Sequence, residues 1–102
     1  MRNVYQAIAE MIGDDPAIQV VKVAEEAGEL AAAWLGYVGA NPRKPPQPLD
    51  AVRLEALHVA VAALVAYAAA GGEHPREALD ACARLARHRI AAAIRAGEPT
   101  DG

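Results

Sequence analysis

The sequence predicts an all-α protein, a four-helix bundle, for three reasons. Apolar residues recur at helical spacing in four stretches, and segments rich in glycine and proline separate these stretches. About a quarter of the chain is alanine, the residue with the highest helix propensity. No stretch shows the alternation of apolar and polar residues that is typical of a strand.

The first two helices are expected at about residues 3–12 and 16–39. Gly13-Asp14-Asp15-Pro16 ends the first helix and begins the second, with Asp14 or Asp15 as the cap and Pro16 in the first turn. The second helix is apolar nearly all round, which predicts that it is largely buried.

Four prolines among residues 41–48 predict a loop over 41–49, because proline cannot continue a helix. Asp50 is expected to cap the third helix, which runs to about Ala70 and stops at Gly71-Gly72. The fourth helix opens at Glu73-His74-Pro75, and residues 97–102 are expected to form a frayed tail. The chain is expected to form one domain over residues 1–102.

The core predicted by this composition is thin, because phenylalanine is absent and aromatic residues are 4 % of the chain. Alanine-rich helices pack closely but bury little apolar area. We therefore expect a second copy of the chain to complete the core, giving a homodimer or a tetramer.

Charge and cysteine content predict a cytoplasmic protein. The net charge of −3 disfavours nucleic acid as a partner. Cys82 is the only cysteine, so an intrachain disulfide is excluded and a reducing compartment is indicated. The first residues lack a secretory signal, and the apolar run at residues 59–72 is too short and too rich in alanine to predict a membrane span.

The second helix carries three carboxylates on one side, at Glu25, Glu26 and Glu29. They fall within roughly a 100° arc of the helix. One interpretation is a solvated acidic face, with Lys22 pairing to Glu25 and Glu26. Because one lysine does not balance three acids and the neighbouring turns are apolar, the pattern favours a bound cation.

The third helix adds a second pair of polar residues. Between residues 54 and 72 the only ionisable side chains are those of Glu55, His58 and Tyr67. Glu55 and His58 are three residues apart and lie on one side of the helix. Buried charges are normally paired or bound to metal, so a divalent ion between the two helices is the simplest neutraliser.

The segment Lys22-Val-Ala-Glu-Glu-Ala-Gly-Glu-Leu30, followed after a loop by Glu55-Ala-Leu-His58, resembles the MazG-like, all-α nucleoside triphosphate pyrophosphohydrolases. That family has a Glu-Glu-x-x-Glu helix and then Glu-x-x-Asp on the next helix. Residues 39–44 are also similar to a loop in small actinobacterial members, and the resemblance spans roughly residues 16 to 70. His58 stands where the family usually has aspartate.

The resemblance implies hydrolysis of a nucleoside triphosphate between its α- and β-phosphates, with pyrophosphate as a product and Mg²⁺ or Mn²⁺ as the cofactor. It assigns Glu25 a catalytic role, either in orienting the attacking water or in holding a further metal ion. The metal ligands that it implies are Glu26, Glu29, Glu55 and His58. The expected substrate contacts are Lys22, Arg43 and Lys44.

His58 leaves alternatives open, because imidazole suits Mn²⁺, Fe²⁺, Co²⁺ or Zn²⁺ better than Mg²⁺. We expect weaker Mg²⁺ binding than with aspartate, with altered metal preference, reduced activity or loss of activity as the outcomes. One alternative function is a non-catalytic homo-oligomeric module that binds nucleotide or a protein partner. Another is a di-metal carboxylate bundle, in which a dimer supplies the two Glu-x-x-His motifs that such a site needs.

Overall fold

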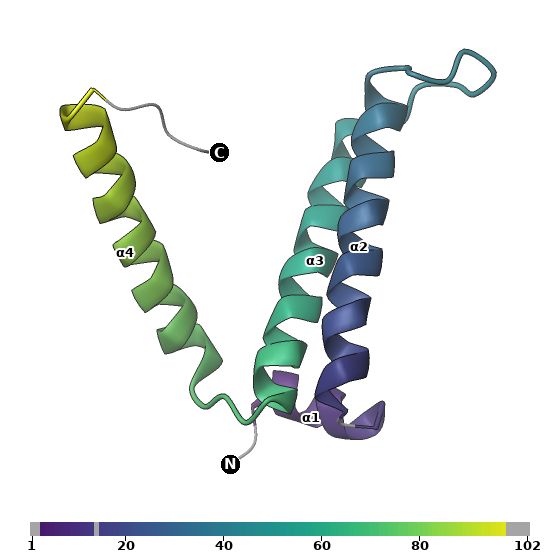
Figure 1. The fold of residues 1–102 in the computed structure, drawn as a ribbon. Coiled ribbons are helices and arrows are strands. Elements are labelled where there is room, and N and C mark those ends of the chain that lie inside the picture. Colours follow the sequence, from purple (N-terminus) through teal and green to yellow (C-terminus); the bar gives the residue numbers. More distant parts are fainter. Residues whose placement is uncertain (1–2, 14, 98–102) are drawn as a thin grey trace. The chain divides into compact units, whose positions relative to one another are not determined.

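The computed structural model describes residues 3–13 and 15–97, and these form helices and loops with no strand (Figure 1). The all-α class is therefore confirmed. The four helices are α1 (Val4–Met11), α2 (Pro16–Tyr37), α3 (Leu49–Ala69) and α4 (Pro75–Arg95). Their ends lie within two residues of the predicted ones.

The contacts divide the chain into two compact units, residues 1–72 and 73–102. In the first unit, α3 contacts both α1 and α2. The long helices α2 and α3 lie side by side along their length (Figure 1). The second unit holds α4. The single domain over residues 1–102 stays a prediction.

Side-chain caps explain where α1 and α2 begin. The Asn3 side chain accepts a hydrogen bond from the Gln6 backbone N–H at 2.9 Å, and the Gln6 side chain accepts one from the Asn3 N–H at 3.1 Å. This reciprocal pair is a capping box. Asp15 caps α2 by accepting from the Ala17 N–H at 3.0 Å, with Pro16 at the first position of the helix. Asp14, the other predicted cap, lies outside the described residues.

The prediction that Asp50 caps α3 is wrong. The N-cap is Pro48, whose extended backbone precedes Leu49, and it offers no side-chain acceptor. Asp50 lies in the first turn of α3, where its carboxylate accepts a hydrogen bond from the guanidinium of Arg53. There it complements the helix dipole instead of capping the helix.

The loop between α2 and α3 folds back onto the last turns of α2. The backbone N–H of Gln47 donates to the Gly36 carbonyl at 3.0 Å, and that of Ala40 donates to the Leu35 carbonyl at 3.0 Å. A Cβ atom at residue 36 would lie 2.9 Å from Gln47 Cγ, so glycine is what allows this close approach. The loop at residues 41–49 is therefore present as predicted, and these two hydrogen bonds attach it to the end of α2.

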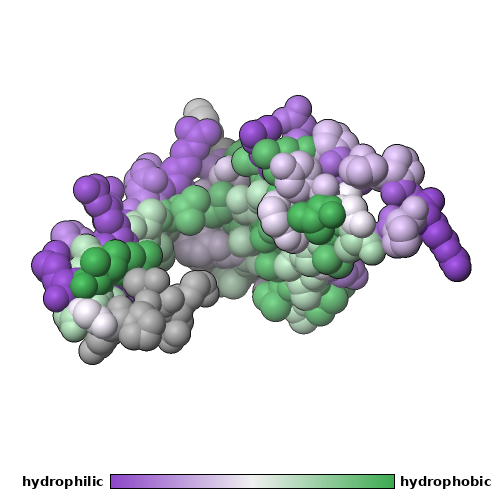
Figure 2. All heavy atoms as spheres, turned by 90° about the horizontal axis from the view of Figure 1, so that it is seen from above, coloured by the Kyte–Doolittle hydropathy of each residue, from purple (hydrophilic) through white to green (hydrophobic). Residues whose placement is uncertain are grey.

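The prediction that α2 is largely buried is wrong for the single chain. Gln19 is the only buried residue of α2, whereas Val20 is 60 % exposed and Leu35 is 54 % exposed. Hydrophobic residues accordingly lie exposed among hydrophilic ones on the face that Figure 2 shows. The reason is geometric, because α3 covers one side of this helix of 22 residues, whereas the short α1 packs mainly against α3.

The apolar stripe of α4 is also exposed. Ile90 is 50 % and Ile94 is 64 % exposed, as are Leu79 and Leu85 to similar extents. These residues recur at helical spacing on a helix that otherwise carries several arginines. An amphipathic helix of this kind normally buries its apolar stripe against another surface.

Among the described residues, α3 is the one helix long and apolar enough to cross a membrane, with 21 residues and a hydropathy of 1.6. Core helices of soluble proteins meet the same criterion. Helix α3 begins at Leu49, ten residues before the apolar run at residues 59–72 that was considered in the sequence. The cytoplasmic location stays a prediction.

We expect Asp15→Ala to lower the free energy of unfolding by about 1 kcal/mol, because it removes the side chain that caps α2. Asp50→Ala is the matched control and should cost less than about 0.5 kcal/mol, since the exposed pair with Arg53 contributes little. Urea unfolding followed by circular dichroism measures both values. Equal losses in the two variants would contradict the assignment of the caps.

Candidate metal site between α2 and α3

Three of the predicted site residues converge where α2 packs against α3. Glu26, Glu55 and His58 each offer one ligand atom, and these atoms all lie within 4.8 Å of one another. His58 Nδ1 is 3.3 Å from Glu55 Oε2 and 4.0 Å from Glu26 Oε2. We call these three residues the acidic cluster. The packing of the two helices thus joins the two halves of the motif.

Helical spacing explains the membership of the acidic cluster. Glu55 and His58 are one turn apart on α3, so their side chains share a face. Glu26 lies on the side of α2 that α3 covers, and its side chain is 30 % exposed. Glu55 is 24 % exposed and His58 is 47 % exposed, so the cluster is half-buried and remains open to solvent on one side.

Glu29 borders the acidic cluster, one turn after Glu26 on α2. The pKa of the Glu29 carboxyl is raised above its ordinary value, chiefly by the negative charge of Glu26. Loss of solvent and the charge of Glu55 raise this pKa further, while His58 opposes the shift. The carboxylates of the two helices therefore repel one another.

One oxygen of Glu26 is buried and accepts no hydrogen bond from the described residues. Glu26 Oε2 is shielded from solvent and has no hydrogen-bond partner among the described residues. Leaving a buried acceptor unpaired costs about 1–3 kcal/mol, and more when the group is charged. A cation beside this oxygen would remove that cost.

The donor set fits a divalent ion. Two carboxylates and one imidazole suit Mn²⁺ or a later transition metal better than Mg²⁺, which prefers oxygen ligands. In one tautomer His58 Nδ1 carries a proton and donates a hydrogen bond to Glu55. In the other tautomer Nδ1 has a free lone pair that can bind a cation. The same placement of His58 beside Glu55 is therefore compatible with a metal-free cluster and with a metal-bound one.

Glu25 stands apart from the acidic cluster. It is exposed and, together with Lys22 and three apolar residues of α2, lines a separate pocket of about 300 Å³, the Glu25 pocket. One residue along a helix corresponds to about 100° of rotation, so α3 covers Glu26 but not Glu25. Glu25 and Glu26 therefore line different pockets, and Glu29 lines neither of the two.

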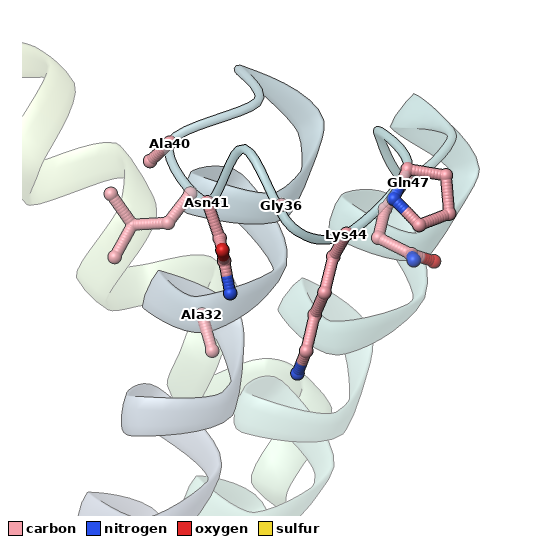
Figure 3. Close-up of a pocket in the computed structure, with 8 residues that line it drawn as sticks. Ala32, Gly36, Ala40, Asn41, Lys44 and Gln47 are labelled. Carbon is pink, nitrogen blue, oxygen red and sulfur yellow. The ribbon is translucent and has the colours of Figure 1, made fainter.

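The basic residues of the loop lie near the far end of α2. Lys44 and Asn41 extend from the loop over a pocket of about 290 Å³, which Ala32 lines on the helix (Figure 3). Ala32 is about 9 Å along the helix axis from Glu26. We call the pocket beneath Lys44 and Asn41 the loop pocket. Arg43 is exposed and does not line it, although its backbone N–H donates to the Asn41 side chain at 3.0 Å.

Sequence reasoning missed Gln19. Its side chain is buried, and its Nε2 has no hydrogen-bond partner among the described residues. Gln19 lines a pocket of about 310 Å³ that also includes Lys22, Glu26 and His58, and we call it the Gln19 pocket. The available signal was a lone uncharged polar residue two helical turns before Glu26, on the same face of an apolar stretch.

No protein-family model matches this chain, and no curated protein and no solved structure matches it either. Functional inference therefore starts from the geometry of the cluster and from the chemistry of its side chains.

We expect Glu29→Gln to raise the melting temperature of the metal-free protein near neutral pH, because it removes a carboxylate that Glu26 and Glu55 repel. A raised pKa means that the folded state holds the Glu29 proton more tightly than the unfolded state does. The repulsion is thus absent when Glu29 is protonated and appears as the pH rises through its folded-state pKa. Thermal melts at a series of pH values measure the effect.

The gain in melting temperature of Glu29→Gln over the wild type should shrink as the pH falls towards the acid range of carboxyl groups. Glu25→Gln is the matched control, since Glu25 lies outside the acidic cluster on the same helix. A gain that is equal at all pH values, or equal in the two variants, would contradict the repulsion.

Proposed function

We propose that this protein is a metal-dependent nucleoside triphosphate pyrophosphohydrolase. The observation that carries the proposal is the convergence of Glu26, Glu55 and His58, with Glu29 at its border. The likeness of the two motifs to the MazG-like family supplies the reaction, and the unpaired oxygen of Glu26 supports a cation at this place.

The metal ion would be held by Glu26, Glu29, Glu55 and His58. When bound, such an ion neutralises phosphate charge and lowers the pKa of water, which is much of what phosphoryl-type hydrolysis requires. Lys22, which lines the pocket next to the cluster, would offer its ammonium group to a phosphate oxygen. The exposed side of His58 leaves a route from solvent to the cluster.

Glu25 and the loop take outer positions in this proposal. Because Glu25 lies on a different pocket from Glu26, it would serve a second ion or a water molecule instead of the first ion. Lys22 lines both pockets and so connects them. Lys44 and Arg43 would contact the substrate from the loop, beyond the end of α2 that carries Ala32.

The protein would act as a homodimer or a tetramer, with the four helices arranged as a bundle of the MazG type. The support is the apolar surface that a single chain leaves exposed, including Leu57 at 63 % and Val21 at 58 %. Exposed apolar surface on this scale is typical of an interaction site.

His58 favours one competing function. Its contact with Glu55, at 3.3 Å, can satisfy both side chains as an ordinary hydrogen bond. A chain that kept the bundle and lost turnover would retain this pair and still bind nucleotide or a protein partner.

The direct test is pyrophosphate release from a panel of nucleoside triphosphates with Mg²⁺ and with Mn²⁺. We expect turnover with at least one metal, and a loss of about 100-fold or more in kcat/KM for Glu26→Gln. The reason is that removing a direct ligand should cost at least as much as removing a residue that only orients one. Glu77→Gln, a carboxylate of α4, is the matched control and should keep full activity.

A folded protein that releases no pyrophosphate with either metal would overturn the proposal. If nucleotide nevertheless raised its melting temperature, the non-catalytic module would replace the hydrolase.

We expect His58→Asp to tighten Mg²⁺ binding by about 10-fold, while Mn²⁺ binding changes less, because it replaces imidazole with an oxygen ligand. Isothermal titration calorimetry of both ions measures the preference. His58→Ala is the control, since it removes the ligand atom and adds none. Equal Mg²⁺ affinities for the two variants would show that residue 58 does not bind the ion.

A further inference from the structure

The Gln19 pocket includes two residues of the acidic cluster, Glu26 and His58, but most of its lining is apolar. Residues from three helices line it, including Ile8 on α1, with Ile12 directly after that helix, and Val61 and Val65 on α3. Among the polar residues that line it, Gln19 is the one with an amide side chain, whereas Lys22, Glu26 and His58 are ionisable. The pocket thus joins an apolar part that holds one amide to a charged part formed by Lys22, Glu26 and His58.

The amide of Gln19 is in an unusual position. The residue is 2 % exposed, and its Nε2 finds no acceptor among the described residues. Buried polar groups are nearly always hydrogen-bonded, because an unpaired one loses its contacts with water and gains none. An apolar side chain of similar length would fill this position at lower cost. The amide is therefore explained if it binds something outside the chain.

The pocket indicates the chemistry of that ligand. Its volume of about 310 Å³ falls within the range of small-molecule sites. Its apolar walls suit an uncharged, flat group, and the free N–H donor requires that this group carry an acceptor. A phosphate does not fit these apolar walls and belongs instead at the charged part of the same pocket, with Lys22, Glu26 and His58.

Spacing along α2 connects the two ends of such a ligand. Gln19 and Glu26 are seven residues apart, which is about 10 Å along the helix and on the same face. A ligand with its ring at Gln19 can therefore extend a sugar and phosphates towards Glu26 and His58.

We propose that the Gln19 pocket binds the nucleobase of the substrate, and that Gln19 Nε2 donates a hydrogen bond to a carbonyl oxygen or ring nitrogen of that base. This inference rests on the proposed function, since it takes the substrate to be a nucleotide. It assigns base recognition to a residue that is not part of either acidic motif.

The test compares Gln19→Met with the wild-type chain. Methionine keeps the length of the side chain and removes the donor. The ligands are α,β-methylene nucleoside triphosphates, which resist the expected cleavage, and inorganic tripolyphosphate, which has no base. Both are titrated in the presence of Mn²⁺. Gln47→Met, the same change at an exposed residue of the loop pocket, is the matched control.

We expect the wild type to bind at least one of the nucleotides about 10-fold or more tightly than tripolyphosphate. Gln19→Met should weaken the binding of that nucleotide by about 10-fold and leave tripolyphosphate and Mn²⁺ binding unchanged. Gln19→Met should also raise the melting temperature of the ligand-free protein by a few degrees, because it removes an unpaired buried amide.

Several results would overturn the inference. Equal nucleotide affinity in wild type and variant, with turnover intact, rejects the role of Gln19 and leaves the hydrolase standing. A parallel loss of Mn²⁺ or tripolyphosphate binding would mean that Gln19 acts on the cluster. A lower melting temperature would mean that the amide has a structural partner. A wild type that binds tripolyphosphate but prefers no nucleotide rejects the base site, and one that binds neither ligand and shows no turnover rejects both proposals.

Discussion

The contact between α2 and α3 is the constraint on which the rest of the structure depends. It is the main packing contact of the first unit, and it is also the place where Glu26 meets Glu55 and His58. Packing therefore brings like charges together, and the raised pKa of Glu29 reports their repulsion. The free energy gained by burying apolar groups along the two helices must offset this repulsion. A bound cation would turn the same contact from a cost into a stabilising link.

Because the core is small, the burial of apolar groups exceeds the repulsion between the carboxylates by only a small free energy. Ala9, Val65 and Ala66 are the buried hydrophobic residues of the described chain, and two of the three are alanines. Alanine buries little area, so each pair of helices contributes modestly. Some large side chains of α2 and α3, such as Trp34 and Leu57, remain about half exposed or more. The polar site and the apolar surface thus occupy the same two helices, and metal, ligand or a second copy would each add to the stability of the fold.

The two pockets beside the cluster divide the chemistry of the site. The Gln19 pocket joins an apolar space to Lys22 and Glu26, whereas the Glu25 pocket shares only Lys22 with it. Three glutamates that are equivalent in the motif are therefore not equivalent in space. Glu26 faces α3, Glu29 lies one turn further on, and Glu25 lies about 100° around the helix from Glu26. A helix can carry the residues of a motif on one side, but the packing of the neighbouring helix decides which of those side chains come into contact with it.

The sequence by itself determined the helices and the proline loop, because helical periodicity, caps and breakers act over a few residues. It identified Glu26, Glu55 and His58, since charged residues on apolar helices are conspicuous. The start of α3 after Pro48 and not Asp50 is a local outcome that the sequence prediction missed. The tertiary structure alone decided that Glu25 lies apart and that the buried residue of α2 is Gln19. Those outcomes depend on which face of each helix is covered, and that is fixed by the angle and register between helices that are distant in sequence.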